Sequence, residues 1–194
     1  LAAEASARLK QKVGGGMKRV TVSEAAKVER EVVRQGLVPA EHWGAAWGRA
    51  VHRAIEGFGR GRRGDNLRVY LRAIVEDEGL TADNVERLLA ILESLESSEQ
   101  WRALVAGSMV RFELPVMLAD SERGQLMEGV VDAAVLGPGG WKVLDWKTDM
   151  SDADWAERQQ QYAVQVELYA ALLETSTGSP ASSSLVRVLP PGEV

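Results

Sequence analysis

The 194-residue sequence contains no cysteine and only two histidines, His42 and His52. The absence of cysteine excludes disulfides, iron–sulfur clusters, cysteine-ligated zinc and thiol catalysis. With two histidines, metal sites built from several imidazoles are excluded as well. A cytosolic setting is the one we expect from this amino-acid usage.

Long apolar runs and targeting segments are also missing. No stretch approaches the roughly 18–20 apolar residues that a membrane span needs, and residues 1–13 lack the apolar core of a secretory signal. The phosphate-binding loop Gly-x-x-x-x-Gly-Lys-Ser/Thr is absent, so we expect no ATP site of that kind. Because residue 1 is leucine rather than methionine, we expect a domain taken from a longer polypeptide.

The composition is that of a soluble globular protein, with 45% apolar and 26% charged residues and a net charge of −5. An acidic chain at first argues against a nucleic-acid partner. Residues 49–72, however, contain seven arginines against two acids. This segment either binds phosphate groups or is a solvated loop. The candidate DNA contacts in it are Arg49, Arg53, Arg60, Arg62 and Arg63.

The chain is expected to divide into an N-terminal arm, residues 1–20, and one domain, residues 21–194. Three consecutive glycines at 14–16 predict a flexible joint in the arm. A Thr-x-x-Glu spacing at 21–24 predicts a helix that begins with a capping box and runs to residue 34. Apolar periodicity predicts four more helices, over residues 47–58, 67–78, 85–95 and 155–174.

After residue 107 the apolar pattern alternates, which indicates strands. The predicted strands cover residues 110–114, 126–136, 141–147 and 184–189, and Pro115 is expected to end the first of them. Helices combined with a strand meander predict an α/β or α+β domain.

A Gly-Pro-Gly-Gly loop at residues 137–140 predicts a tight hairpin between two of these strands. If Pro138 and Gly139 form the turn, Asp132 lies opposite Asp145, and Lys147 shares a face with Asp145.

Opposed carboxylates cost about 0.2–1 kcal/mol on an exposed sheet and more between apolar strands. A divalent cation removes that penalty, and oxygen ligands suit Mg²⁺ or Mn²⁺. The alternative is a solvated Asp145–Lys147 pair at a sheet edge, with Asp132 at a strand end. A register shift of one residue would favour this alternative, because it puts the two acids on opposite faces.

Further polar candidates lie on the predicted helices. His52 is either a third metal ligand beside two carboxylates or a packing residue, and Glu56 follows it by one turn. Gln165 and Tyr169 share a helix face at positions i and i+4, where the tyrosine is either functional or simply buried with a satisfied hydroxyl.

Together and in this order, these motifs resemble the PD-(D/E)XK nuclease superfamily. More narrowly, they resemble the C-terminal nuclease domain of bacterial recombination helicase–nucleases of the AddA and RecB type. The matching segments are TVSEA at 21–25, GRAVH at 48–52, ELP at 113–115, EGVVD at 128–132, DWKTD at 145–149 and YAVQVELY at 162–169.

The resemblance implies a restriction-endonuclease-like core, with a mixed central sheet flanked by helices, and an Mg²⁺-dependent deoxyribonuclease that leaves 5′-phosphates, with exonuclease action expected. Relatives of the AddB type bind an iron–sulfur cluster through four cysteines, which this chain lacks. Many relatives carry tyrosine where this chain has Trp146. The resemblance assigns His52, Asp132 and Asp145 as metal ligands, Lys147 as the catalytic lysine, Gln165 and Tyr169 as residues that position the strand, and Glu113 as a frequently acidic strand position.

The resemblance also implies partners. These are DNA, fed as a single strand by a helicase domain upstream in the same polypeptide, and in some systems a second subunit. They would act in recombination and double-strand break repair in the bacterial cytoplasm, without a membrane. Two alternatives stay open: a non-catalytic DNA-binding or interaction module with the same fold, and a stand-alone phage or repair exonuclease.

Overall fold

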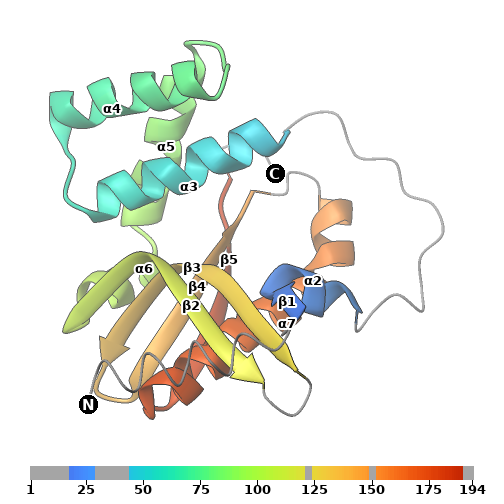
Figure 1. The fold of residues 1–194 in the computed structure, drawn as a ribbon. Helices are drawn as coiled ribbons and strands as arrows, with labels where there is room; N and C mark the ends of the chain where they lie inside the picture. The colour runs from blue at the N-terminus through green and yellow to red at the C-terminus, as the bar shows by residue number, and fades with distance from the viewer. Residues whose placement is uncertain (1–17, 29–43, 121–123, 149–151, 190–194) are drawn as a thin grey trace, which may run out of the picture.

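A five-stranded mixed sheet forms the centre of the computed structural model, which describes residues 18–28, 44–120, 124–148 and 152–189 (Figure 1). Strands β2 and β4 run antiparallel to β3, whereas β1 is parallel to β3 and β5 is parallel to β4. The expected α/β class with a mixed sheet is confirmed. The strands are β1 (Lys18–Thr21), β2 (Met109–Asp120), β3 (Gln125–Gly137), β4 (Gly140–Lys147) and β5 (Ala181–Arg187).

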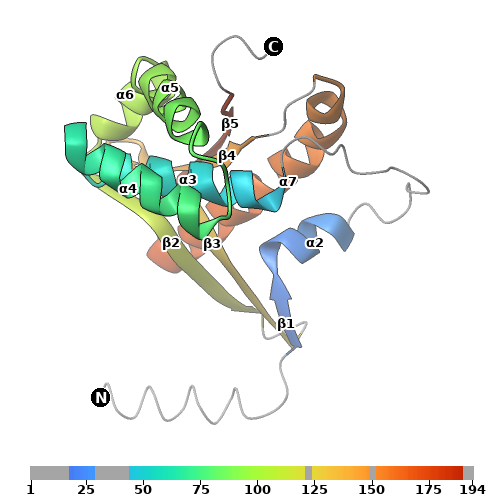
Figure 2. The same cartoon turned by 90° about the horizontal axis from the view of Figure 1, so that it is seen from above.

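Helices cover both faces of the sheet and give a three-layered domain (Figure 1). One face is covered by α3 (Ala45–Gly59), α4 (Gly64–Asp77), α5 (Asn84–Glu96) and α6 (Glu99–Val105). The other face is covered by α2 (Val22–Val28) and α7 (Asp152–Thr177). Figure 2 shows α3 and α4 side by side in the first layer. Among the described residues, no helix is both long and apolar enough to cross a bilayer.

The β3–β4 hairpin has the register that the Gly-Pro-Gly-Gly loop predicts. Leu136 pairs with Trp141, and the ladder continues to Ala133 opposite Leu144. Asp132 and Asp145 follow directly after this last pair. On the same edge of β3, β1 pairs only with residues 125–128. Residues 129–132 therefore lie in a gap between β1 and β4, and this gap contains the polar residues described below.

Two elements differ from the expectation. The prediction that Pro115 ends its strand is wrong, because β2 continues to Asp120 with Pro115 opposite Val130. Among the described strands β2 pairs only with β3, and an edge strand tolerates proline because half of its N–H groups point away from the sheet. Helix α6 is not foreseen, although Ser98 caps it by accepting a hydrogen bond of 3.1 Å from the Trp101 N–H.

The start of the domain confirms the predicted capping box. The backbone N–H of Thr21 donates to the Glu24 carboxylate at 2.9 Å, and the Glu24 N–H donates to the Thr21 hydroxyl at 3.2 Å. Residues 18–20, which we assign to the arm from the sequence, form part of β1. The glycine joint and residues 29–34 of the predicted first helix lie outside the described residues.

Candidate active site

Four elements bring ionisable side chains to the gap between β1 and β4. His52 comes from α3, whose neighbouring residues Val51 and Ile55 are fully buried against the sheet. Glu113 comes from β2, Asp132 from β3, and the pair Asp145 and Lys147 from β4. Asp132 and Asp145 are 9% and 2% exposed, and both are thus buried acids, which the apolar flanks of their strands predict.

The backbone of Trp146 fixes two of these side chains. Its N–H donates a hydrogen bond of 2.7 Å to Asp132 Oδ2, and its carbonyl oxygen lies 3.0 Å from His52 Nε2. The Trp146 side chain is 1% exposed and packs in the core on the α3 face, as expected from its alternation with Asp145. The contribution of this residue is therefore made by its peptide groups, whatever side chain stands there.

His52 and Asp132 face each other in a way that calls for a positive charge between them. A carbonyl oxygen can only accept a hydrogen bond, so His52 Nε2 carries the proton that it shares with Trp146. Nδ1 then presents a lone pair to Asp132 Oδ1 at 3.2 Å. Either a second proton or a metal ion makes this contact favourable. Burial lowers the pKa of His52, but the hydrogen bond and charge of Asp132 outweigh it and raise the pKa above 6.5.

Glu113 completes a group of three possible ligands. Among the described residues, the ligand atoms of His52, Glu113 and Asp132 all lie within 4.8 Å of one another. Glu113 has a φ of +50°, a left-handed conformation that is rare for a strand residue with a side chain. Its pKa is raised by burial and then by the charge of Asp132. One imidazole nitrogen and two carboxylates fit a divalent cation such as Mg²⁺ or Mn²⁺.

Asp145 does not belong to this group of three, although we expect it as a metal ligand from the sequence. Its Oδ2 lies 2.7 Å from Lys147 Nζ, and the two side chains are 3% and 17% exposed. Burial and then the charge of Asp132 raise the pKa of Asp145 to about 6, although Lys147 acts in the opposite direction. Burial lowers the pKa of Lys147, but the carboxylate of Asp145 outweighs this and raises it.

The α7 side of the site contains Gln165 and Tyr169. Gln165 Nε2 donates to the Tyr169 hydroxyl at 3.4 Å and to the Ser23 hydroxyl at 3.3 Å. The pKa of Tyr169 is raised first by burial, and the charges of Asp145 and Asp132 act in the same direction. Gly129 allows this approach, because a Cβ there would lie 2.6 Å from the Tyr169 ring. Ser23 lies in the TVSEA segment, but no sequence signal assigns it this contact.

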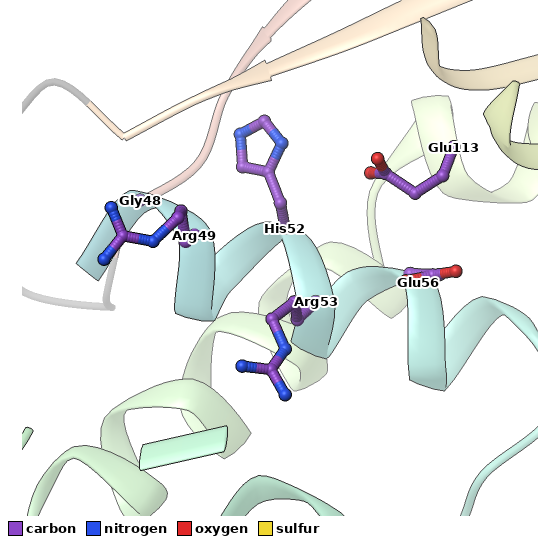
Figure 3. A pocket seen from close by; sticks show the side chains of 6 residues that line it. All are labelled: Gly48, Arg49, His52, Arg53, Glu56 and Glu113. Atoms are coloured by element: carbon purple, nitrogen blue, oxygen red, sulfur yellow. The ribbon is translucent and has the colours of Figure 1, made fainter. Parts of the chain in front are cut away.

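An open hollow of about 440 Å³ adjoins the group of three ligands (Figure 3). Figure 3 shows the side chains of His52 and Glu113 directed to the same side of α3, whereas that of Arg53 points away from them. The hollow is lined by Gly48, Arg49, His52, Arg53, Glu56 and Glu113.

Each of the five arginines predicted to contact DNA has a partner within the chain. Arg49 and Arg53 both pair with Glu78, at 2.7 and 3.1 Å. Three of the partners are acids outside residues 49–72, so the local positive charge inferred from the sequence is partly neutralised. The remaining pairs are Arg53 with Asp77, Arg60 with Glu56, Arg62 over Tyr70, and Arg63 over Phe58 and 4.0 Å from Glu96.

The raised pKa values predict that the protein in EDTA is more stable in mild acid than at pH 8. His52, Glu113 and Asp145 all bind protons more readily in the folded state than in the unfolded chain. The free energy of unfolding falls with rising pH wherever the folded state binds more protons. With the pKa of Asp145 at about 6, that residue alone should lower the free energy of unfolding by about 1 kcal/mol between pH 5 and pH 8.

Urea unfolding at pH 5, 6, 7 and 8 in EDTA measures this effect. Asp132→Asn should flatten the dependence, because the charge of Asp132 raises the pKa of each of the three groups. A wild-type protein that loses stability steadily from pH 8 to pH 5 would contradict the prediction.

A sequence model described as the PD-(D/E)XK nuclease superfamily matches residues 6–193 of the chain. Similar proteins include the AddA component of the ATP-dependent helicase/nuclease of Levilactobacillus brevis, which is 27% identical over 67% of this chain and 12% of that protein. The corresponding protein from Desulfitobacterium hafniense DCB-2 is 26% identical over 80% of this chain and 12% of its own length. The one from Carboxydothermus hydrogenoformans is 43% identical over 27% of this chain and 5% of its own length.

A solved structure shows the same fold. The crystal structure named "Putative exonuclease" from Eubacterium rectale superimposes with a TM-score of 0.52 at 15% sequence identity, over 79% of this chain and 58% of that one. The chain itself spans 12% of the length of the helicase/nuclease proteins from Levilactobacillus brevis and Desulfitobacterium hafniense.

Proposed function

Because the chain belongs to the PD-(D/E)XK nuclease superfamily, we propose that it hydrolyses DNA phosphodiester bonds with a bound Mg²⁺, for which Mn²⁺ can substitute. We further propose that it is the nuclease domain of a bacterial helicase–nuclease of the AddA type, acting in the cytoplasm in double-strand break repair and recombination. The helicase domain would lie in the remaining length of such a protein, of which this chain matches 12%, and a second subunit would assemble with it.

One observation carries the proposal: two acceptor atoms, His52 Nδ1 and Asp132 Oδ1, lie 3.2 Å apart beside a buried Asp145–Lys147 ion pair. A structural role would not favour this arrangement, because burying acids near one another costs free energy unless a cation compensates them. A non-catalytic module would have no use for that cost. The arrangement is, in contrast, what a metal-assisted phosphodiesterase needs.

His52, Glu113 and Asp132 would hold the metal ion, and Asp145 would join them once its carboxylate turns from Lys147. A bound Mg²⁺ would lower the pKa of a water ligand and offset the charge that develops on the phosphoryl group. Lys147 is placed to orient that water and to stabilise the pentacovalent phosphorus. Attack by the water breaks the bond between phosphorus and the 3′-oxygen, so the products carry a 5′-phosphate and a 3′-hydroxyl.

The hollow beside His52 gives the DNA strand a place to lie. Arg49 and Arg53 line it, and a phosphate that binds there would compete with Glu78 for their guanidinium groups. Gln165 and Tyr169, on the other side of the acids, would position the strand. Contacts of this kind make the KM for DNA rise with salt concentration, which can be read in the assay that follows.

The proposal predicts that the chain cleaves end-labelled single-stranded DNA in Mg²⁺, slowly and at high enzyme concentration, because no helicase domain feeds it a strand. Asp145→Ala and Lys147→Ala are expected to lower the rate by on the order of 10³-fold, since each removes stabilisation of the transition state. The measurement is the product pattern on 5′- and 3′-labelled strands, which also separates exonuclease from endonuclease action.

EDTA and the Asp145→Ala protein serve as blanks for contaminating nucleases. Cleavage at the wild-type rate by either variant would rule out the assigned site. Rapid, processive digestion by this chain alone would contradict the expected dependence on a helicase.

A further inference from the structure

Two aromatic side chains of α7 lie over two neighbouring cations of the sheet. Lys147 and Arg187 are register partners on the parallel strands β4 and β5. Lys147 Nζ lies 4.9 Å from the centroid of the Tyr162 ring, and Arg187 Cζ lies 5.5 Å from that of Trp155. These distances are within the range of a cation–π interaction.

The aromatic pair is a continuous unit. Trp155 and Tyr162 are seven residues apart, so they lie on one face of α7 two turns apart. Their ring centroids are 6.4 Å apart at an interplanar angle of 41°, a tilted contact that fixes one ring against the other. Because Trp155 lies over Arg187, the Tyr162 ring is left to Lys147.

Lys147 therefore has two holders of different kinds. One is the carboxylate of Asp145, at 2.7 Å, and the other is the ring of Tyr162. The side chain is only 17% exposed, so these two contacts define most of its polar surroundings. A metal ion bound by Asp145 would compete with the ammonium for that carboxylate. The ring contact does not depend on the carboxylate and would remain.

We propose that Tyr162 is a positioning residue for Lys147, which holds the ammonium beside the reacting phosphate when Asp145 is engaged by the metal. This inference rests on the proposed nuclease function. The ring, and not the hydroxyl, provides the contact, because the negative face of the aromatic system attracts the cation. Without it, the flexible four-carbon side chain of Lys147 has no fixed place, also because Arg187 repels it from the neighbouring strand.

Two substitutions separate the ring from the hydroxyl. Tyr162→Leu removes the aromatic face, and we expect it to lower kcat by about tenfold, with KM for DNA within about twofold of wild type. Tyr162→Phe keeps the ring, and we expect at least about half of the wild-type kcat. Thermal melting of both variants in EDTA controls for a general loss of structure. Wild-type kcat in Tyr162→Leu, or an equal loss in both variants, would overturn the inference.

A second measurement reads the contact without any catalysis. The chain has six lysines, Lys10, Lys12, Lys18, Lys27, Lys142 and Lys147, so lysine labelled with ¹³C at Cε gives a simple spectrum, in which Lys147→Arg identifies the signal of Lys147. We expect that signal upfield of the other five in wild type and in Tyr162→Phe, from the ring current, and among them in Tyr162→Leu. An unchanged signal in Tyr162→Leu would overturn the inference.

The two proposals fail in distinguishable ways. If the wild-type chain does not cleave DNA, the nuclease proposal fails, and the ring-current shift still decides whether Tyr162 holds Lys147. If the wild type cleaves DNA and Tyr162→Leu cleaves equally well, only the positioning role is lost.

Discussion

Replacing Asp132 by asparagine is expected to abolish DNA cleavage, on the order of 10³-fold or more, while the fold stays intact. The amide oxygen of asparagine can still accept the Trp146 N–H, and its NH₂ group can donate to His52 Nδ1, which Asp132 Oδ1 faces at 3.2 Å. Both contacts of the carboxylate are thus preserved in shape. What is lost is the negative charge that a cation needs.

The same substitution should remove the stabilisation that a metal ion gives to the folded state. An ion at 100 times its Kd stabilises by about 2.7 kcal/mol, which corresponds to a rise in Tm of about 5–10 °C for a domain of this size. We expect this rise in the wild type with Mn²⁺ or Mg²⁺ and none in Asp132→Asn. In EDTA the variant should melt no lower than the wild type, because the charge of Asp132 disfavours the ionised forms of Asp145 and Glu113.

The matched control is Glu93→Gln, which removes one negative charge from an exposed position of α5. It should keep both the activity and the metal-dependent rise in Tm. If Asp132→Asn retains the rise, the ion binds elsewhere and the assigned ligands are wrong. If the wild type shows neither a rise nor cleavage, the alternative of a non-catalytic module with this fold is favoured.

The hairpin shows how much of the site the sequence can predict. Alternation and a tight loop specify a register, and the register alone places Asp132 next to Asp145 at the end of the ladder. The burial of both acids follows from the apolar residues around them. Local rules are sufficient here, because the two strands are joined by a loop of two residues and their pairing involves no distant part of the chain.

Contacts between distant segments could not be predicted in this way. Periodicity places His52 on a helix, but only the packing of α3 on the sheet brings it to the peptide groups of Trp146. Glu113 is assigned by family resemblance alone, because nothing in its neighbours indicates a positive φ. The arginine segment looked basic because Glu78 and Asp77, which neutralise part of it, come from beyond residue 72.

The site also explains why β3 pairs incompletely along one edge. Its residues 129–132 lie between the ladders with β1 and β4. Asp132 therefore has space to accept a hydrogen bond from Trp146 through its side chain where a regular ladder would use the backbone. The sheet gives up hydrogen bonds at this point, and the resulting gap admits both the acids and the ring of Tyr169 next to Gly129.

Gly140→Ala is expected to be the most destabilising small substitution in the hairpin. Gly140 has a φ of +105°, which a residue with a side chain rarely adopts, and a Cβ there would overlap the carbonyl oxygen of Pro180. That oxygen accepts the Trp141 N–H at 2.8 Å, the bond with which the pairing of β4 and β5 begins. Backbone strain and displacement of this strand together should cost about 3–5 kcal/mol.

The measurement is thermal or urea unfolding, in which Tm should fall by about 10 °C or more. The control is Gly139→Ala, one residue earlier in the same turn, where a Cβ meets no atom within 4 Å and φ is not in the left-handed range. Because alanine restricts the unfolded chain, this variant should be neutral or more stable by up to about 1 kcal/mol. Equal stability of the two variants would mean that β4 and β5 do not begin as the structure places them, and the position of Lys147 opposite Arg187 would then fall with that register.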